Sequence, residues 1–340
     1  MLTVYTEKHK LHDTDGVIVE DRPLGSFEVP ARAEAIVAAV REAGLGPVVE
    51  PDDHGTAPIL TVHDAEYVHF VQNVHTAEAA YYDEAGPVMV WTFAGRHAMR
   101  KPGPVMWQKG YYAFGWGSPI LEGTWEAAYW SAQCALTAAE RVQGGERAAY
   151  ALCRPPGHHA GPDLYGGYCY LNNAAIAARW LARYGAQVAI LDVDYHHGNG
   201  TQLAFYDDPA VLYCSLHADP DEEYPYYWGA KDEVGAGPGR GTNHNWPLPR
   251  GTTGREYLAA LDEALAVVDG FAARYLVVSV GFDVVEDDPE GGFRLTVEDV
   301  REVGRRIGGL GLPTVIVQEG GYAVGRLGEN AVAFLRAVEH

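Results

Sequence analysis

The sequence predicts an α/β fold, in which a buried parallel β-sheet carries helices on both faces. Short apolar runs rich in β-branched residues recur along the chain, and they are near-continuous rather than alternating, as in strands buried on both faces. Segments with helical periodicity lie between many of these runs, and this alternation is typical of a sheet covered on both sides. The predicted strands are Leu2–Tyr5, Ala148–Cys153, Val188–Val193, Val211–Leu216, Leu276–Val280 and Thr314–Val317.

The helical segments are bounded by the expected breakers, since several of them close at a glycine. They span Pro30–Ala43, Thr124–Val142, Asn173–Tyr184, Thr253–Ala273 and Thr296–Ile307. The sequence contains no internal repeat, low-complexity tract or linker-like stretch. We therefore expect one domain over residues 1–340.

Composition limits the classes of protein to consider. Hydrophobic residues make up 47% of the 340 residues, enough for a large core. The net charge of −21 argues against a nucleic-acid partner and is compatible with attracting cations. No apolar run is long enough for a membrane span, and the N-terminus lacks the features of a signal peptide, so we expect a cytoplasmic protein. The 4 cysteines form no CxxC motif and are expected to be reduced packing residues.

Residues 85–121 break the alternation of strands and helices. This segment is rich in glycine, proline and aromatic residues, contains no acid, and carries Arg96, Arg100, Lys101 and Lys109. A loop of this length without periodicity is usually functional or disordered, and its aromatic content argues against disorder. It is either an interface element or a loop folded over its own domain.

Polar residues crowd the carboxyl ends of five predicted strands, where open α/β sheets bind ligands. They occupy five segments, Arg154–His159, Asp192–Gly200, Ser215–Asp219, Gly281–Asp283 and Glu319–Tyr322. Because these ends share one edge of a parallel sheet, we expect the five segments to converge on one rim.

One of these segments has the spacing of a metal site. Asp192, Asp194 and His196 alternate along the chain, so an extended backbone places their side chains on one side. Asp283 ends another predicted strand and supplies a further ligand. Three protein ligands and one open position form the usual pattern of a catalytic zinc site. We therefore predict a metal held by Asp194, His196 and Asp283.

The remaining polar residues fit metal-assisted hydrolysis of an amide. His158 and His159 follow two prolines and a glycine, and histidine serves as base or acid near neutral pH. Asp192 and Asn199 are suitable partners to fix the two imidazole tautomers. A phenol beside a metal can donate to an oxyanion, a role predicted for Tyr322, although a packing tyrosine is the alternative.

These motifs resemble the arginase/deacetylase superfamily, and within it the zinc-dependent histone deacetylases and bacterial acetylpolyamine amidohydrolases. The resemblance rests on RPPGHHA (Arg154–Ala160), GGYCYLNN (Gly166–Asn173), LDVDYHHGNGTQ (Leu191–Gln202), GFD (Gly281–Asp283) and EGGY (Glu319–Tyr322). It covers nearly the whole chain, and the motifs occur in the family's order.

The resemblance implies an eight-stranded parallel sheet and zinc, or ferrous iron, on Asp194, His196 and Asp283. It also implies that the histidine pair activates a water molecule, with His158 hydrogen-bonded to Asp192 and His159 to Asn199. Tyr322 would be the oxyanion donor. The substrate would contact Gly167, Tyr168 and Tyr224. A structural potassium ion would be bound around Asp192, Asp194, His196, Ser215 and Leu216.

The resemblance also implies a cationic substrate, an acetylated polyamine, and a homodimer built by the 85–121 insertion. Acidic residues expected in that insertion are replaced by Met106 and Gly117. Two rim loops carry eight other acids, which we expect to draw cations to the site. They are Asp219, Asp221, Glu222 and Glu223 in the first loop, and Glu286, Asp287, Asp288 and Glu290 in the second. Among them, Glu290 stands where many deacetylases carry an apolar residue and polyamine-selective ones can carry Glu.

Three other functions remain to be weighed. A protein acetyl-lysine deacetylase would use the same residues on another substrate. An arginase-like ureohydrolase with two manganese ions would need more metal ligands than Asp194, His196 and Asp283 provide. A non-catalytic acyl-amine binding module would not need Tyr322 or the histidine pair. We therefore predict a zinc-dependent deacetylase that removes acetyl groups from acetylated amines.

Overall fold

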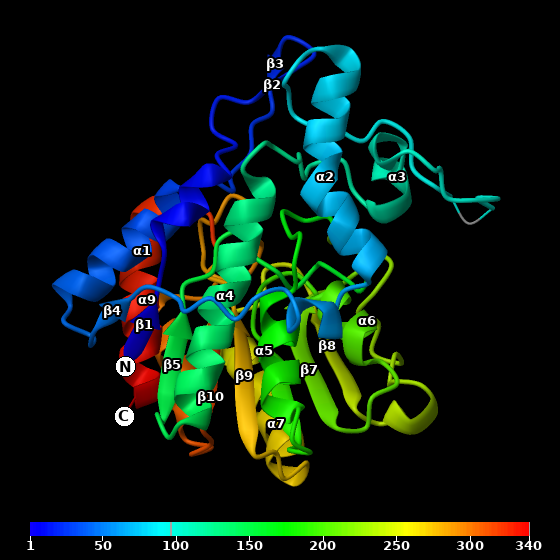
Figure 1. Cartoon of the computed structure of the whole chain (residues 1–340). Helices are drawn as coiled ribbons and strands as arrows, with labels where there is room; N and C mark the ends of the chain where they lie inside the picture. Colours follow the sequence, from blue (N-terminus) through cyan, green and yellow to red (C-terminus); the bar gives the residue numbers. More distant parts are fainter. Residues whose placement is uncertain (96, 340) are drawn as a thin grey trace.

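The computed structural model describes residues 1–95 and 97–339, and its centre is one eight-stranded parallel sheet (Figure 1). The strands lie in the order β4-β1-β5-β10-β9-β6-β7-β8. In chain order they are β1 (Leu2–Val4), β4 (Val48–Val49), β5 (Ala148–Ala151), β6 (Val188–Asp192), β7 (Val211–Ala218), β8 (Asn243–Leu248), β9 (Tyr275–Val280) and β10 (Thr314–Gln318). A separate two-stranded hairpin consists of β2 (Ile18–Val19) and β3 (Arg22–Pro23).

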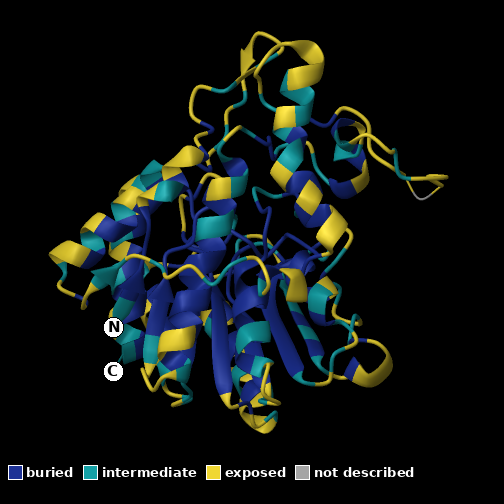
Figure 2. Cartoon of the chain, in the orientation of Figure 1, coloured by how far each residue is buried: buried dark blue, intermediate teal, exposed yellow. Residues whose placement is uncertain are grey.

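The predicted fold class is confirmed, and so is the interpretation of the apolar runs as buried strands. Every residue of β6, β7, β9 and β10 is buried, which the dark interior of Figure 2 illustrates. All six predicted strands are present. The prediction missed the two edge strands, because β4 has only two residues and β8 is polar at Asn243, His244 and Asn245.

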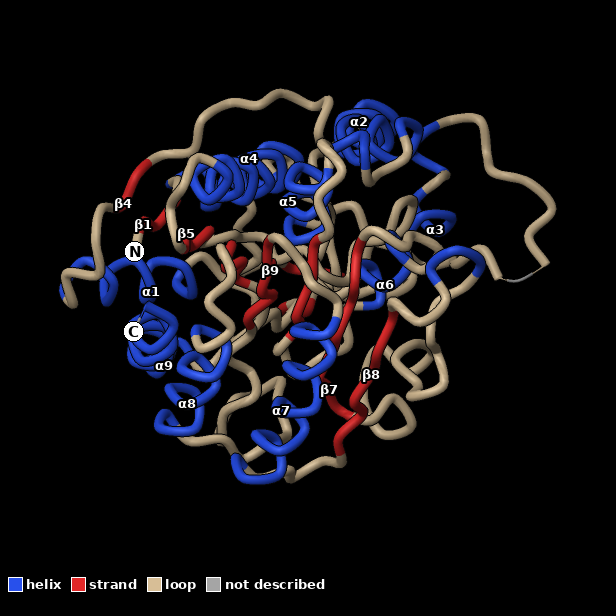
Figure 3. Tube along the Cα trace, turned by 90° about the horizontal axis from the view of Figure 1, so that it is seen from below, coloured by secondary structure: helices blue, strands red, loops and turns tan. Residues whose placement is uncertain are grey.

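Helices cover both faces of the sheet (Figure 3). Their bounds are α1 (Ala31–Glu42), α2 (Ala65–Tyr82), α3 (Lys109–Tyr112), α4 (Thr124–Gln143), α5 (Asn173–Ala182), α6 (Asn199–Phe205), α7 (Gly254–Gly270), α8 (Val297–Gly308) and α9 (Val324–Glu339). Short 3-10 segments span Glu7–Leu11, Ile59–Thr61, Val105–Trp107 and Gly237–Gly239. Helices α4 and α5 lie on one face, while α1, α7, α8 and α9 lie on the other.

The five predicted helices are all present, and α2, α6, α9 and the short α3 were missed. Helix α2 buries Tyr67, Phe70, Val71 and Val74, the spacing of an amphipathic helix, so the sequence did contain its signal. Within the described residues, no helix is both long and apolar enough to cross a membrane.

The described part of the 85–121 segment, residues 85–95 and 97–121, is largely irregular, as predicted. It contains the short helix α3 and extends outward beside α2 (Figure 1). Lys101 pairs with Glu66 and Lys109 with Glu78, so the segment is tied to α2 of its own chain. Trp91 and Met99 remain 59% and 96% exposed. The loop is thus anchored on its own domain while apolar side chains stay uncovered in the chain alone. Arg96, counted among its basic residues, lies outside the described residues.

Candidate active site

Four adjacent strands at the middle of the sheet carry the residues predicted to hold the metal and to act in catalysis. The order β5-β10-β9-β6 places side by side the segments that follow these strands, although the strands are distant in sequence. All of them run parallel, so their carboxyl ends meet at one edge. This is the edge at which α/β sheets bind ligands.

The three predicted metal ligands come together. One ligand atom from each of Asp194, His196 and Asp283 lies within 4.8 Å of the others. Nδ1 of His196 lies 3.1 Å from a carboxylate oxygen of Asp283 and 3.4 Å from one of Asp194. Both aspartates are fully buried. Among the described residues, this is the group of His, Cys, Asp and Glu side chains suited to hold a metal ion.

The electrostatics of this group fit a bound cation. Burial and the neighbouring Asp194 carboxylate raise the pKa of Asp283 to about 7, because two buried negative charges repel one another. The backbone beside these carboxylates has room only for glycine. A Cβ on Gly281 would lie 2.0 Å from an Asp194 oxygen, and one on Gly320 would lie 2.3 Å from an Asp283 oxygen. The site therefore gathers two carboxylates and an imidazole that a divalent cation would neutralise.

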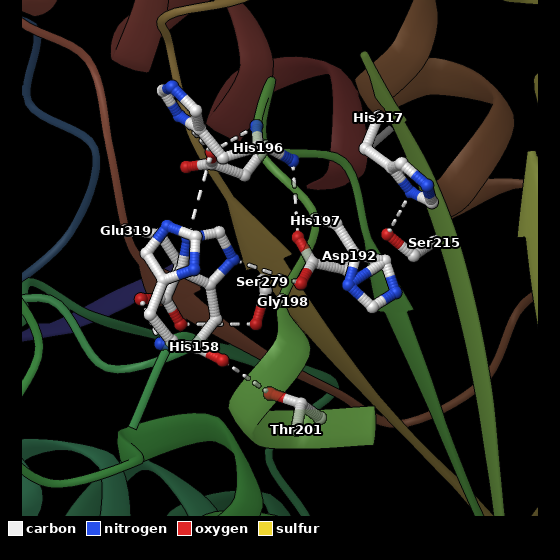
Figure 4. Close-up of polar contacts among 12 residues, drawn as sticks. His158, Asp192, His196, His197, Gly198, Thr201, Ser215, His217, Ser279 and Glu319 are labelled. Carbon is white, nitrogen blue, oxygen red and sulfur yellow. Dashed lines mark hydrogen bonds and ion pairs between the residues drawn. The ribbon is translucent and has the colours of Figure 1, made fainter. Parts of the chain in front are cut away.

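The histidine pair lies beside the metal group with the predicted partners, and Figure 4 shows His158 with Asp192 and His196. Nδ1 of His158 is 3.1 Å from Asp192, and Nδ1 of His159 is 2.7 Å from Oδ1 of Asn199. Nε2 of His158 lies 3.7 Å from Asp194. The two rings are 4.1 Å apart between centroids.

The two histidines have different electrostatic surroundings. Burial disfavours the charged form of His158, but the Asp194 and Asp192 carboxylates outweigh it and raise its pKa to about 10. Burial and the neighbouring imidazoles of His158 and His196 hold the pKa of His159 well below its usual range. A cation on Asp194 would withdraw negative charge from His158 and lower its pKa.

Tyr322 lines the same cavity as His159 and His196. Its turn is fixed by Asp288, a buried carboxylate that accepts the backbone N–H groups of Tyr322 at 2.7 Å and Ala323 at 2.9 Å. The prediction that Asp288 is one of the rim acids was wrong, because its side chain is buried under this turn. It serves as a buried acceptor for two backbone N–H groups.

The cavity has a volume of about 540 Å³ and is walled by aromatic side chains. It contains the three residues expected to contact substrate, Gly167, Tyr168 and Tyr224. Gly167 has a φ of +55°, and a Cβ there would lie 2.4 Å from the His159 ring, so only glycine fits. The expected wall residues are thus brought together at one cavity.

Phe114 is a wall residue that the sequence analysis did not single out. Its ring stacks on Tyr224, with centroids 5.8 Å apart and an interplanar angle of 20°. A Cβ on Gly166 would lie 2.5 Å from the Phe114 ring, which explains the glycine. Phe114 belongs to the 85–121 segment, so the insertion completes the active-site wall of its own chain.

The acidic residues at the rim of the cavity differ in whether their carboxylates already have a partner. Glu223 accepts a hydrogen bond from the Tyr195 hydroxyl at 2.8 Å and pairs with Arg250 at 3.1 Å. Glu290 lines the cavity half-buried, and within the described residues its carboxylate forms no ion pair. Burial raises its pKa. Of the two positions that lack the expected acids, Gly117 lines the cavity and Met106 is buried elsewhere.

The residues expected around potassium also lie together. Asp192 of β6 pairs in register with Ser215 of β7, and both are fully buried, as is Leu216. The Ser215 hydroxyl lies 2.8 Å from Nδ1 of His217 (Figure 4). The structure therefore places these residues next to one another on the adjacent strands β6 and β7.

This fold and site define a hydrolase of the metal-dependent deacetylase class. The histone deacetylase domain matches residues 26–338, and the chain belongs to this family. The chain is accordingly a deacetylase.

Among its relatives, acetylpolyamine amidohydrolase 1 of Pseudomonas aeruginosa is 48% identical, covering 100% of this chain and 99% of the relative. The acetylpolyamine amidohydrolase of Mycoplana ramosa is 43% identical over 99% of both chains. A crystal structure of the acetylpolyamine aminohydrolase from Burkholderia pseudomallei superimposes with a TM-score of 0.93 at 45% identity, covering 99% of this chain and 98% of the other.

Proposed function

We propose that the protein hydrolyses the acetyl amide of acetylpolyamines, with zinc held by Asp194, His196 and Asp283. The observation that carries this proposal is the buried Asp-His-Asp group beside a histidine pair and a tyrosine in one aromatic cavity. Relatives named acetylpolyamine amidohydrolase, at 43–48% identity over almost the whole chain, support the choice of substrate. Structural potassium near Asp192 and Ser215, and a single domain over the whole chain, are part of the same proposal.

The residues divide the chemistry among them. A divalent cation at this group would polarise the acetyl carbonyl and make a water molecule more acidic. His158 and His159 take the proton of the attacking water and return one to the departing amine, and such catalysis contributes about 10²–10⁴-fold. Their tautomers are set by Asp192 and Asn199. Tyr322 donates a hydrogen bond to the oxygen on which negative charge develops.

Glu290 is the residue proposed to recognise the substrate's cation. It lines the cavity, it is half-buried, and within the described residues it has no cationic partner. A secondary ammonium a few ångströms beyond the amide could pair with it, and a hydrogen bond to a charged group stabilises by about 1.5–3 kcal/mol. Glu290 would thereby replace the acids absent at Met106 and Gly117.

Substitution of Glu290 tests this assignment against the alternative of protein acetyl-lysine. Glu290→Leu should lower kcat/KM for an acetylated polyamine by about 10–100-fold, since about 1.4 kcal/mol corresponds to a factor of ten. It should spare or raise kcat/KM for a neutral acetyl-lysine analogue.

The measurement is a competition assay in which an acetylated polyamine and an acetyl-lysine peptide are hydrolysed together. Glu286→Leu, which removes an exposed acid of the same loop, is the matched control and should leave the ratio unchanged. Equal losses on both substrates in Glu290→Leu would favour acetyl-lysine and remove the role of Glu290.

We further propose that the 85–121 segment forms a homodimer interface. Exposed apolar side chains concentrate there, including Trp91, Phe93, Met99, Trp107 and Trp116, and such patches commonly mark protein interfaces. The protein should sediment as a dimer, and Trp91→Asp combined with Met99→Asp should yield monomers.

Sedimentation velocity at several protein concentrations measures this. Tyr184→Asp is the control, because Tyr184 is 81% exposed outside the segment and its substitution should leave the dimer intact. A wild-type protein that sediments as a monomer at all concentrations would end the proposal.

A further inference from the structure

Glu28 is a fully buried carboxylate that none of the roles above requires. It lies in the loop before α1, outside the metal group, and its side chain has no exposure to solvent. A buried charge is costly unless it is paired and hydrogen-bonded. Its partners therefore indicate its purpose.

Two buried arginines share this carboxylate. Oε1 of Glu28 lies 2.8 Å from Nη1 of Arg32 and 2.8 Å from Nε of Arg154, and Oε2 accepts from Nη2 of Arg154 at 3.0 Å. Burial disfavours the charge, but the two guanidinium groups hold the pKa of Glu28 below its usual range. Burial lowers the pKa of the adjacent His9 and His12 to about 4, so both are neutral near pH 7. Glu28 is thus the anion at the centre of this cluster.

Arg32 connects the cluster to the turn that carries Tyr322. Its Nε donates to the carbonyl of Gly321 at 2.5 Å, and Nη2 donates to the carbonyl of Glu319 at 2.7 Å. Its guanidinium carbon lies 4.6 Å from the centroid of the Tyr322 ring. The planar guanidinium therefore spans the turn on both sides of Gly320 and supports the phenol.

Arg154 connects the same cluster to the turn that carries the histidine pair. It is the first residue of the Arg154–His159 segment and also donates to the carbonyl of His9 at 2.7 Å. The Glu319 side chain joins the two turns directly, since it accepts the backbone N–H groups of Gly157 at 2.7 Å and His158 at 3.1 Å. Figure 4 shows Glu319 beside His158. Glu28 thus contacts both arginines, Arg32 beside the Tyr322 turn and Arg154 at the start of the turn that carries the histidine pair.

We propose that Glu28 is a positioning residue for the reaction: by orienting Arg32, it holds the Glu319–Tyr322 turn so that the Tyr322 phenol keeps its place opposite the histidine pair. This inference rests on the proposed role of Tyr322 as oxyanion donor. Glu28→Gln keeps the shape of the side chain but removes the charge that both arginines share. The guanidinium of Arg32 then loses its fixed orientation, and the phenol shifts relative to the reacting carbonyl.

A double-mutant cycle with Tyr322→Phe tests the inference. Glu28→Gln alone should lower kcat by about 10–100-fold, with KM nearly unchanged, because small misplacements of a reacting group cost up to about 10²-fold. In the Tyr322→Phe background the same substitution should cost less than about threefold, since residues that act as a unit are not additive. Metal content by elemental analysis should stay at the wild-type level. Equal losses in the two backgrounds would mean a merely structural role and would overturn the inference.

Two further variants keep the test decisive. Arg32→Lys retains the positive charge but not the fork that reaches Gly321, Glu319 and Glu28, so it should reproduce the non-additive loss even if Glu28→Gln does not fold. Additive losses for Arg32→Lys would likewise overturn the inference. Asp208→Asn removes a carboxylate paired with Arg179 outside the site and should leave kcat unchanged.

The cycle separates this inference from the proposed function. A Tyr322→Phe variant with wild-type kcat contradicts the oxyanion role itself, and this inference fails with it. An impaired Tyr322→Phe variant combined with additive losses contradicts only the role of Glu28.

Discussion

Asp283→Ala should remove the bound metal and, with it, nearly all activity. Asp283 supplies one of the three ligand atoms, and the remaining Asp194 and His196 leave the cation half-coordinated. Removing a residue that only hydrogen-bonds a metal ligand already lowers metal affinity by about 10–100-fold. Removing a ligand itself should therefore lower metal affinity by more than about 100-fold. Elemental analysis after dialysis against metal-free buffer measures the metal content, and it also identifies the ion as zinc or iron.

The fold should survive this substitution better than a typical buried truncation. Burial and the neighbouring Asp194 carboxylate raise the pKa of Asp283, since the two carboxylates repel one another when no cation lies between them. Removing one of them relieves that repulsion in the metal-free protein, although the backbone N–H of Tyr195 loses its acceptor at 3.1 Å. The metal-free variant should therefore melt close to the metal-free wild type.

Two further variants test whether the loss of metal is due to the Asp283 carboxylate. Asp283→Asn preserves the shape and an acceptor for the Tyr195 N–H but supplies a neutral amide, so it should also lose the metal. Glu286→Ala removes an exposed acid of the following loop and should retain full occupancy. Full metal occupancy in Asp283→Ala would exclude the proposed ligand set.

The central strands and the site could be predicted from sequence for the same physical reason. Strands β6, β9 and β10 are buried on both faces, and such strands consist of near-continuous apolar runs. Each is followed within three residues by an acidic residue, Asp194, Asp283 or Glu319, because the chain leaves the sheet at the edge where the ligand binds. The interruption of an apolar run by Asp192 and Asp194 is therefore visible without any structure.

The parts that escaped prediction depend on contacts between distant segments. Phe114 lies in a segment without periodicity and becomes a wall of the cavity only by stacking on Tyr224. Asp288 has the sequence context of a solvated loop acid, yet it is buried under the Tyr322 turn. Glu28 precedes a helix like many surface acids, and its burial follows from Arg154, far along the chain. Sequence patterns record periodicity along one element, and they do not record which distant side chain will cover it.

Tyr322→Phe should lower kcat by about 10²–10³-fold, the usual cost of removing one oxyanion donor. The loss should fall on kcat with KM nearly unchanged, because negative charge develops on the carbonyl oxygen only in the transition state. The substitution removes the hydroxyl and leaves the other contacts of the side chain in place. Phenylalanine keeps the ring contacts with Tyr168, at 5.8 Å between centroids, and with the Arg32 guanidinium at 4.6 Å, so only the hydroxyl is lost.

Steady-state kinetics on an acetylated polyamine, combined with elemental analysis, measures this prediction. Tyr165→Phe is the matched control, since the hydroxyl of Tyr165 is buried without a hydrogen-bond partner in the described structure and its removal should leave kcat unchanged. The backbone N–H of Tyr322 remains bound to Asp288 in the variant, so the turn should keep its conformation and the metal should stay bound. A kcat near that of the wild type would reduce Tyr322 to a packing residue. A raised KM together with lost metal would mean that the hydroxyl supports the site in the ground state, not the transition state.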